Sequence, residues 1–161
     1  GITYKGFLYA GLMIKNSEIS VLEFNCRFGD PETQPILMRM ESDLAEICLL
    51  AAQGNLNERE ISWTKDSALG VVIASKGYPF EYEKNKEINN LENENSRQKV
   101  FHAGTKTQEG KVLSNGGRVL CVTALGSTLL DSKNLAYQKV KNIDWKDGFY
   151  RDDIGDKAIK S

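Results

Sequence analysis

The spacing of apolar residues changes near residue 60 and divides the chain into two parts. Before that point, Gly6–Ile14 and Ile19–Cys26 are apolar runs rich in strand-forming residues, and a four-residue polar turn separates them, which predicts a hairpin. Residues 42–53 carry apolar side chains at helical spacing and end before Gly54, which predicts a helix with Ser42 as its N-cap. A two-stranded hairpin and one helix do not form a stable core alone, so this part needs a partner surface.

After residue 60 the pattern is mainly that of short strands. We expect strands at residues 61–63, 68–74, 100–103, 111–114 and 118–125, followed by a helix over 128–142 that Ser127 caps. Residues 81–99 are rich in Glu, Asn and Lys and predict an exposed loop with at most a short edge strand. The predicted fold class is α+β, with residues 1–60 and 61–161 as separate domains.

Charge and cysteine content narrow the possible partners. The formal net charge of -1 argues against a polybasic surface, so we expect no nucleic-acid and no membrane partner. The longest apolar stretches, Ile47–Ala52 and Val119–Leu125, are far shorter than the roughly 20 residues that cross a bilayer. Cys26, Cys48 and Cys121 share no metal-binding spacing and lie among apolar neighbours, which predicts buried, reduced thiols and a cytoplasmic protein.

The segment from Leu22 to Thr33 carries the residues best suited to chemistry. Side chains alternate across a strand, so Glu23, Asn25 and Arg27 are expected to share one polar face. A carboxylate and an amide oxygen two residues apart suit a hard divalent cation that keeps several waters and is completed by phosphates. Arg27 would add a planar fork for a phosphate or carboxylate. By itself, the pattern also fits a half-exposed strand of an antiparallel sheet.

The residues that follow favour a ligand site over that alternative. Gly29 permits a tight turn, Asp30 can act as a cap, and Pro31 suits the first position of a helix that would carry Glu32 in its first turn. Backbone donors, an arginine and three acidic groups would then converge within a few residues. An arginine buried without an anion is costly, so Arg27 is expected to contact Asp30, Glu32 or a ligand.

The run LEFNCRFGDPETQ resembles the metal-binding strand and following loop of ATP-grasp ligases. Further runs resemble the C-terminal third of one ATP-grasp family, the phosphoribosylamine–glycine ligases, in the same order along the chain. These runs are GFLYAGLMI, SDLAE, ALGVVIASKGYP, VFHAGT, NGGRVLCVTALG and FYRDDIG. The resemblance implies that residues 1–60 are the last part of an ATP-grasp domain, built of antiparallel strands and helices. It implies that residues 61–161 are a small β-rich α+β C-terminal domain.

The resemblance also implies an activity and its cofactors. Such an enzyme uses ATP to make an acyl phosphate of glycine, which the amine of 5-phosphoribosylamine attacks in purine biosynthesis. Glu23 and Asn25 would hold Mg²⁺ or Mn²⁺ at the ATP phosphates, and Arg27 would lie beside the acyl phosphate as the catalytic arginine. Asp30 and Glu32 would orient the ammonium groups of the substrates.

A second candidate site lies at Asn115–Arg118. In related purine-pathway enzymes a basic residue in a similar C-terminal hairpin receives a ribose 5-phosphate, so the resemblance suggests Arg118 for this role, with Lys111 as a helper. A simple hairpin with a solvated arginine remains the alternative.

Parts of the family pattern have no counterpart here. Residues 6–14 contain no acidic residue that could add a metal ligand, and nothing resembles the family's N-terminal substrate domain or its ATP-covering loop. We therefore expect those parts in an N-terminal portion of the same polypeptide, and we expect the isolated chain to be inactive as a ligase. The alternative is an independent β-rich binding or subunit-docking module without catalysis.

Overall fold

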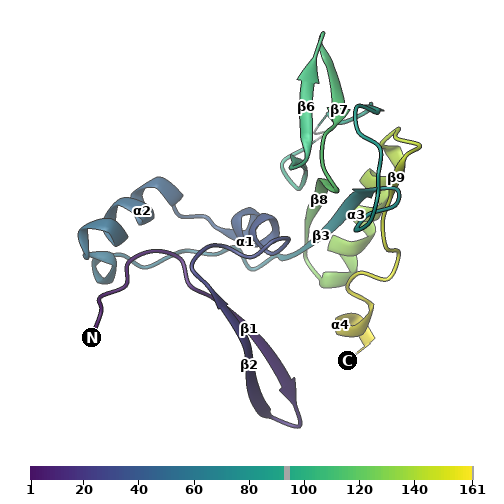
Figure 1. Ribbon diagram of the computed structural model, residues 1–161. Helices are drawn as coiled ribbons and strands as arrows, with labels where there is room; N and C mark the ends of the chain where they lie inside the picture. Colours follow the sequence, from purple (N-terminus) through teal and green to yellow (C-terminus); the bar gives the residue numbers. More distant parts are fainter. Residues whose placement is uncertain (93–94, 161) are drawn as a thin grey trace. The chain divides into compact units, whose positions relative to one another are not determined.

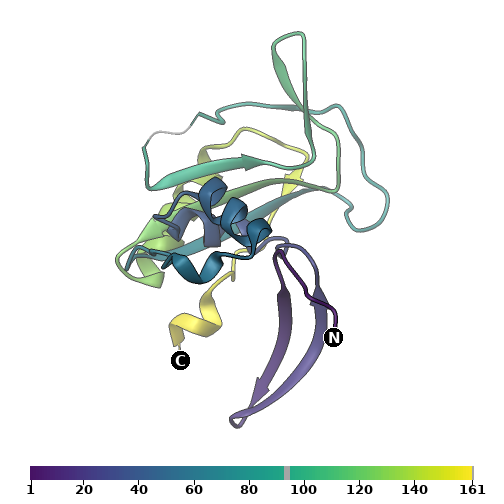
Figure 2. The same ribbon diagram turned by 90° about the vertical axis from the view of Figure 1, so that its left-hand side faces the viewer.

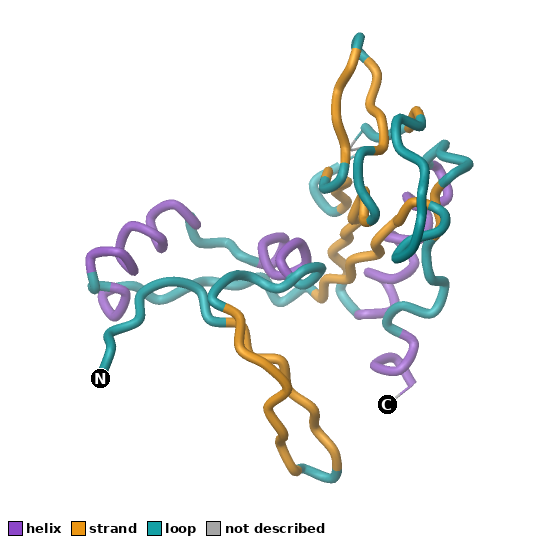
Figure 3. Tube along the Cα trace, in the orientation of Figure 1, coloured by secondary structure: helices purple, strands orange, loops and turns teal. Residues whose placement is uncertain are grey.

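The computed structural model describes residues 1–92 and 95–160 and divides into two compact units. The first unit holds residues 1–33 and 40–64, and the second holds residues 34–39 and those from 65 onward. Every strand pairing among the described residues is antiparallel, and helices accompany the sheets (Figure 3). The α+β class predicted from the sequence is confirmed.

The first unit contains the predicted hairpin, formed by β1 (Tyr9–Lys15) and β2 (Glu18–Asn25) (Figures 1 and 2). Asn16 and Ser17 connect the strands, and both have positive φ angles, 51° and 67°. Two central residues with positive φ match the type I′ turn, whose twist suits a tight hairpin. These two strands form a sheet of their own.

A bulge interrupts the pairing of β1 with β2. Gly11 lies opposite Glu23, whereas the next residue, Leu12, lies opposite Val21, so Leu22 is the extra residue on β2. A bulge bends the strand and redirects the side chains that follow it. Here it separates the apolar turn end of the hairpin from the end that carries Glu23.

Helix α2 (Leu44–Gln53) follows the predicted range closely, but its N-cap is Asp43. The Asp43 carboxylate accepts hydrogen bonds from two amides of the first turn, at 2.8 and 3.3 Å. The prediction of Ser42 as cap is wrong, because the Ser42 hydroxyl instead accepts a hydrogen bond from the backbone amide of Ser62 at 2.8 Å. Gly54 ends the helix in the left-handed conformation, with φ of 86°.

The strand predicted at residues 61–63 is reduced to one isolated bridge between Met40 and Trp63. The amide of Glu41 donates to the Ser62 carbonyl beside it. A short 3₁₀ turn, η1 (Leu56–Glu58), precedes this pairing and has no clear signal in the periodicity.

The main sheet of the second unit has the strand order β5-β8-β3-β9. Its strands are β3 (Ser67–Ser75), β5 (Gln98–His102), β8 (Arg118–Gly126) and β9 (Gly148–Phe149). The predicted strands at 68–74, 100–103 and 118–125 are thus present. β8 is a central strand with six consecutive buried residues, which explains its unbroken apolar sequence.

Helix α3 (Leu129–Asn142) packs on β3 and β8 and closes the core of this unit. Its cap is Thr128, one residue after the predicted Ser127: the Thr128 hydroxyl accepts from the Asp131 amide, and the Asp131 carboxylate accepts from the Thr128 amide. The buried core residues belong mostly to these three elements. They are Leu69, Val71, Ile73, Ile88, Val100, Val119, Leu120, Val122, Ala124, Ala136, Val140 and Trp145.

A three-stranded sheet of order β4-β7-β6 completes the strands of the second unit. Its members are β4 (Glu87–Ile88), β6 (Thr105–Gln108) and β7 (Lys111–Ser114). The predicted loop at 81–99 does contain this one short edge strand, but Ile88 is buried in the core, so the segment is not wholly exposed. Residues 93 and 94 of that prediction lie outside the described residues.

Two short helices are α1 (Thr33–Arg39) and α4 (Asp156–Lys160). The sequence predicts a helix in the place of α1, beginning at Pro31, and gives no prediction for α4. The part of α1 that belongs to the second unit reaches β3, because a Cβ on Gly70 would meet Pro35 at 3.1 Å. An ion pair from Lys133 to Asp156 attaches α4 to α3. Over residues 1–92 and 95–160, none of the helices combines the length and apolar character needed to span a membrane.

All three cysteines are free thiols, but only Cys121 is buried. The prediction of burial is wrong for Cys26 and Cys48, which are exposed. Cys26 lies just beyond the end of β2, and Cys48 lies on α2.

Candidate functional site

Glu23 and Asn25 lie side by side at the end of β2, as the alternation of a strand requires. The side-chain amide of Asn25 donates a hydrogen bond of 3.0 Å to Oε1 of Glu23. Glu23 is exposed and Asn25 is half-buried, so both can be reached from solvent. Gly11 is opposite Glu23, and a Cβ there would lie 3.2 Å from the Glu23 Cγ, so the absent side chain leaves room for this carboxylate.

The chemistry of this pair fits a hard cation that keeps much of its own hydration. The two side chains offer carboxylate and amide oxygens, which Mg²⁺ and Mn²⁺ prefer. Among the described residues, no group of three or more His, Cys, Asp or Glu side chains is placed to hold a metal ion. Two protein ligands are enough only where waters and substrate phosphates supply the rest.

Arg27 lies in a bend beyond β2, because the strand ends at Asn25. Its guanidinium is exposed and donates to the backbone carbonyl of Phe28 at 2.8 Å. Within the described residues no ion pair joins Arg27 to Asp30 or Glu32, and contact with a ligand, the third expected possibility, stays a prediction. The expected cost of a buried, unpaired arginine does not arise, since solvent reaches this side chain.

The turn at residues 28–33 differs from its predicted form. Helix α1 begins at Thr33, so Pro31 is not its first residue, and the Asp30–Pro31 peptide bond is cis. The carbonyl of Gly29 accepts hydrogen bonds from both the amide and the hydroxyl of Thr33. The turn is therefore closed by Gly29 and Thr33, with exposed Asp30 at its tip.

The aromatic rings of Phe7 and Phe28 anchor this turn to the segment before β1. Their centroids are 4.0 Å apart with an interplanar angle of 31°. A packed aromatic pair of this kind contributes on the order of 1 kcal/mol beyond its burial. The turn is thus held at one side by packing and at the other by hydrogen bonds.

Tyr9 at the start of β1 also contacts this turn, and the sequence reasoning missed it. Its hydroxyl donates to Oε1 of Glu32 at 3.2 Å, in a half-buried position. The negative charge of Glu32 and the hydrogen bond to it raise the pKa of Tyr9, with smaller contributions from burial and Glu23, while Arg27 acts in the opposite direction. The sequence signal that could have placed Tyr9 near this site is the register of the hairpin, in which Tyr9 lies opposite Asn25.

The second predicted site has a different local structure from a hairpin. β7 and β8 belong to different sheets, so residues 115–117 connect two sheets. The crossing is close-packed: Asn115 donates to the Gly104 carbonyl at 2.7 Å, and a Cβ on Gly116 would meet the Gly104 Cα at 3.0 Å. Arg118 begins β8 at this crossing and is exposed.

Lys111 lies at the opposite end of β7 from this crossing and forms an ion pair with Glu87 on β4, at 2.8 Å.

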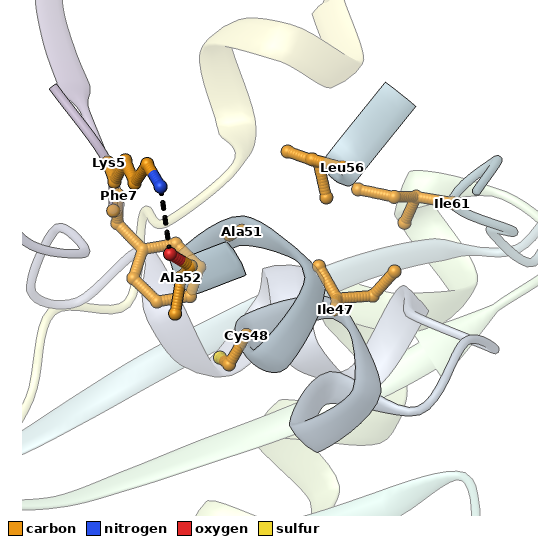
Figure 4. A pocket seen from close by; sticks show the side chains of 9 residues that line it. Lys5, Phe7, Ile47, Cys48, Ala51, Ala52, Leu56 and Ile61 are labelled. Atoms are coloured by element: carbon orange, nitrogen blue, oxygen red, sulfur yellow. Dashed lines mark hydrogen bonds between the residues drawn. The ribbon is translucent and has the colours of Figure 1, made fainter. Parts of the chain in front are cut away.

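An apolar cavity of about 260 Å³ lies beside α2 in the first unit (Figure 4). Its lining comes from the segment before β1, from α2 and from the residues after it. These residues are Lys5, Gly6, Phe7, Ile47, Cys48, Ala51, Ala52, Leu56 and Ile61. Lys5 closes one side with a 3.0 Å hydrogen bond to the Ala52 carbonyl. Such a lining suits a hydrocarbon side chain rather than a phosphate.

Many large apolar side chains of the first unit are exposed, and most lie on or beside the hairpin. They are Ile2, Tyr4, Leu8, Leu12, Met13, Ile14, Ile19, Val21, Leu22, Phe24, Leu49, Leu56 and Trp63. Ile14 and Ile19 lie directly opposite each other and are 65% and 66% exposed. Exposed apolar side chains that gather on one element are typical of surfaces that contact another protein segment.

The chain is similar throughout to known ligases. A phosphoribosylamine–glycine ligase of Pasteurella multocida is 51% identical over 160 residues, which is 99% of this chain and 37% of the relative. One of Vibrio cholerae is 53% identical over 161 residues, covering 99% of this chain and 38% of the relative. The chain therefore spans less than two-fifths of the length of these relatives.

A solved structure supports the same relationship. The crystal structure of phosphoribosylamine–glycine ligase from Thermotoga maritima matches with a TM-score of 0.79 and 34% identity, over 91% of this chain and 36% of the other. Two family models match as well. Residues 1–33 match the phosphoribosylglycinamide synthetase ATP-grasp (A) domain, and residues 68–157 match the C domain of the same enzyme. Because the C-domain match alone covers more than half of the chain, this protein belongs to the phosphoribosylglycinamide synthetase family.

Proposed function

We propose that this chain is the C-terminal part of an ATP-dependent ligase that joins glycine to 5-phosphoribosylamine in purine biosynthesis. The observation that carries the proposal is the identity of 51% and 53% to ligases of that name over 99% of the chain. In the reaction, the γ-phosphoryl group of ATP passes to the glycine carboxylate and ADP leaves. The amine nitrogen of phosphoribosylamine then attacks the acyl carbon, phosphate leaves, and the nitrogen loses a proton.

Glu23 and Asn25 would hold Mg²⁺ or Mn²⁺, with ATP as co-substrate. This assignment is supported by their adjacent oxygens, by their accessibility to solvent and by the space left at Gly11, which has no side chain and lies opposite Glu23. When bound, the metal supplies charge neutralisation for the transferred phosphoryl group. Glu23 and Asn25 would determine where the metal is held relative to β2.

Arg27 would stabilise the acyl phosphate, and Asp30 and Glu32 would receive the amino groups of the substrates. The exposed guanidinium of Arg27 donates to the backbone carbonyl of Phe28, and it can exchange that contact for a phosphate at small cost. Asp30 and Glu32 lie in one short turn anchored at Phe28 and Thr33. Carboxylates held on such a turn can bind ammonium groups without a large ordering cost.

Arg118 would bind the ribose 5-phosphate of phosphoribosylamine, with Lys111 as a weaker helper. The support for Arg118 is its exposed position at a glycine-rich crossing, where the backbone is fixed by close packing. Lys111 would act more weakly because Glu87 already neutralises it.

We also propose that the ATP-grasp portion ends near residue 60 and that residues 61–161 form the C-terminal domain. Support comes from the two family matches, which cover residues 1–33 and 68–157, and from the compact units, which change at residues 64 and 65.

A further portion of polypeptide, of the kind the relatives have, would be the partner of the first unit. The exposed apolar residues of the hairpin and the cavity beside α2 support this proposal, because an independent binding module would not be expected to leave them uncovered. The same observation counts against the alternative of a non-catalytic module. The expected compartment is the cytoplasm, which suits three free thiols.

The test compares the chain alone with a chimera. The chimera joins the Pasteurella multocida ligase, up to the residue aligned with Gly1, to residues 1–161 of this chain. With ATP, glycine, phosphoribosylamine and Mg²⁺, the chimera should release ADP, and the chain alone should release none above background. Turnover by the chain alone would overturn the proposal that it is an incomplete part of the enzyme. A folded but inactive chimera would overturn the proposed activity.

A further inference from the structure

The contact between Tyr9 and Glu32 joins two segments that are far apart in sequence. The phenol hydroxyl reaches Oε1 of Glu32 at 3.2 Å, across 23 residues of chain. Both residues are half-buried, so the hydrogen bond is partly shielded from water. This hydrogen bond uses one of the two oxygens of the Glu32 carboxylate.

Gly29 makes this arrangement sterically possible. A Cβ at Gly29 would lie 2.3 Å from Oε2 of Glu32 and 2.9 Å from Cε2 of Tyr9. The carboxylate and the phenol ring therefore occupy the volume that any other residue at position 29 would fill. Gly29 itself is buried, and its carbonyl is held by Thr33. Tyr9, Gly29 and Thr33 together thus fix the direction of the Glu32 carboxylate.

We propose that Tyr9 is a positioning residue that holds Glu32 over Gly29, so that the second carboxylate oxygen receives the ammonium group of glycine. The inference rests on the proposed function, since it assigns the supporting contact for a substrate-binding carboxylate. A flexible glutamate loses rotamer freedom when it binds an ammonium ion. The Tyr9 hydroxyl fixes the side chain beforehand, and this lowers the cost of binding.

The kinetic test uses the chimera with Tyr9→Phe, which removes the hydroxyl and keeps the ring against Gly29. The KM for glycine should rise about tenfold while kcat stays within about twofold, because a charge-assisted hydrogen bond that orients the binding group is lost. Tyr4→Phe is the matched control: it also removes a hydroxyl with a hydrogen bond, here to the Phe7 carbonyl, but does not touch Glu32. The KM for ATP should not change in either variant.

A double-mutant cycle decides whether Tyr9 acts through Glu32. In the double variant Tyr9→Phe, Glu32→Gln, the KM for glycine should equal that of Glu32→Gln alone. Additive effects would overturn the proposal, as would an unchanged KM in Tyr9→Phe when the wild-type chimera is active. An inactive wild-type chimera would overturn the proposed function, and the role of Tyr9 with it. An active wild-type chimera with an unchanged KM in Tyr9→Phe would overturn the role of Tyr9 alone, so the two failures are distinguishable.

A measurement on the 161-residue chain itself checks the contact without activity. The ¹³C shift of the Glu32 carboxyl carbon should move in Tyr9→Phe and stay unchanged in Tyr4→Phe, with both variants keeping the amide spectrum of a folded first unit. An unmoved Glu32 signal in folded Tyr9→Phe would show that the hydroxyl does not hold this carboxylate, and would overturn the proposal.

Discussion

The Asn25 side-chain amide donates a 3.0 Å hydrogen bond to Glu23, two residues earlier on the same strand. The bond holds two oxygen-bearing side chains next to each other at the end of β2, before the chain turns at Gly29. A cation that takes an oxygen from each would require the amide group to rotate, because its nitrogen now faces the carboxylate. In the proposed metal site, a rotation of the Asn25 side chain would turn both oxygens toward one ion.

Glu23→Ala in the chimera should lower kcat by about 100-fold, because it removes the proposed charged metal ligand and no core contact. Turnover is measured across a magnesium titration, in which the variant should need more metal. Glu18→Ala at the other end of β2 is the control, since Glu18 is also an exposed glutamate of this strand. Unchanged turnover of Glu23→Ala at limiting magnesium would remove Glu23 from the site.

Arg118→Ala in the chimera should raise the KM for phosphoribosylamine about tenfold and leave the KM for ATP unchanged, because the guanidinium proposed to bind the ribose 5-phosphate is lost. Lys111→Ala should raise the same KM by less than about threefold, since Glu87 already pairs with Lys111. Initial rates with each substrate varied in turn measure both values. A change confined to the KM for ATP would reassign Arg118.

Replacing Ile14 and Ile19 together by Thr should reduce self-association of the free chain, because this exposed cross-strand pair would lose its apolar surface and keep strand-forming residues. Sedimentation velocity at several concentrations measures the effect. Phe80→Ser is the control, because Phe80 is an apolar residue of the second unit that is 83% exposed and lies outside the hairpin. If the control abolished association and the hairpin variant did not, the hairpin would not be the associating surface.

Thr128→Ala should lower the free energy of unfolding by about 1 kcal/mol, because the cap of α3 is lost. Ser127→Ala should lower the free energy of unfolding by less. The Ser127 hydroxyl donates a hydrogen bond to the Asp131 side chain, whereas the backbone amide of Asp131 donates to Thr128. Urea unfolding followed by far-ultraviolet circular dichroism compares the variants. A loss of stability in Ser127→Ala that equals or exceeds the loss in Thr128→Ala would contradict Thr128 as the cap.

The same cap predicts a pH dependence. Hydrogen bonds from the hydroxyls of Thr128, first, and of Ser127 lower the pKa of Asp131. A carboxyl whose pKa is lower in the folded state stabilises the fold above its unfolded pKa, and this contribution is lost as the pH falls through the folded value. The stability difference between wild type and Asp131→Asn should thus be largest at neutral pH and shrink as the pH falls through the lowered pKa of Asp131. In a Thr128→Ala background the pH dependence should shrink; a difference that persists in acid would contradict the assignment.

Local patterns in the sequence were enough for much of the fold. Two apolar, strand-forming runs with a four-residue polar turn between them predict the β1–β2 hairpin, and the apolar run at 118–125 predicts the buried strand β8. Caps were misassigned by one residue at both Ser42 and Ser127, because a capping choice between adjacent side chains depends on the exact backbone angles. The strand at 61–63 failed because its pairing partner, Met40, lies in an irregular segment.

The candidate site divides in the same way. Glu23 and Asn25 are two residues apart, so the strand period alone places them together. The partner of Glu32 could not be read in this way, because Tyr9 reaches it only after the hairpin folds back and Gly29 leaves space for the carboxylate. Lys111 likewise acquires Glu87 as its partner through the pairing of β4 with β7.

The sequence by itself determined the elements and motifs whose causes lie within a few neighbouring residues: the hairpin turn, the buried strands, the helix that ends at Gly54 and the Glu23–Asn25 pair. The tertiary structure decided which distant groups meet. It placed the Tyr9 hydroxyl on Glu32 and turned the glycines before Arg118 into a crossing between two sheets. Periodicity reports the face on which a side chain lies, whereas a contact across many residues depends on register, bulges and the space that a missing Cβ leaves.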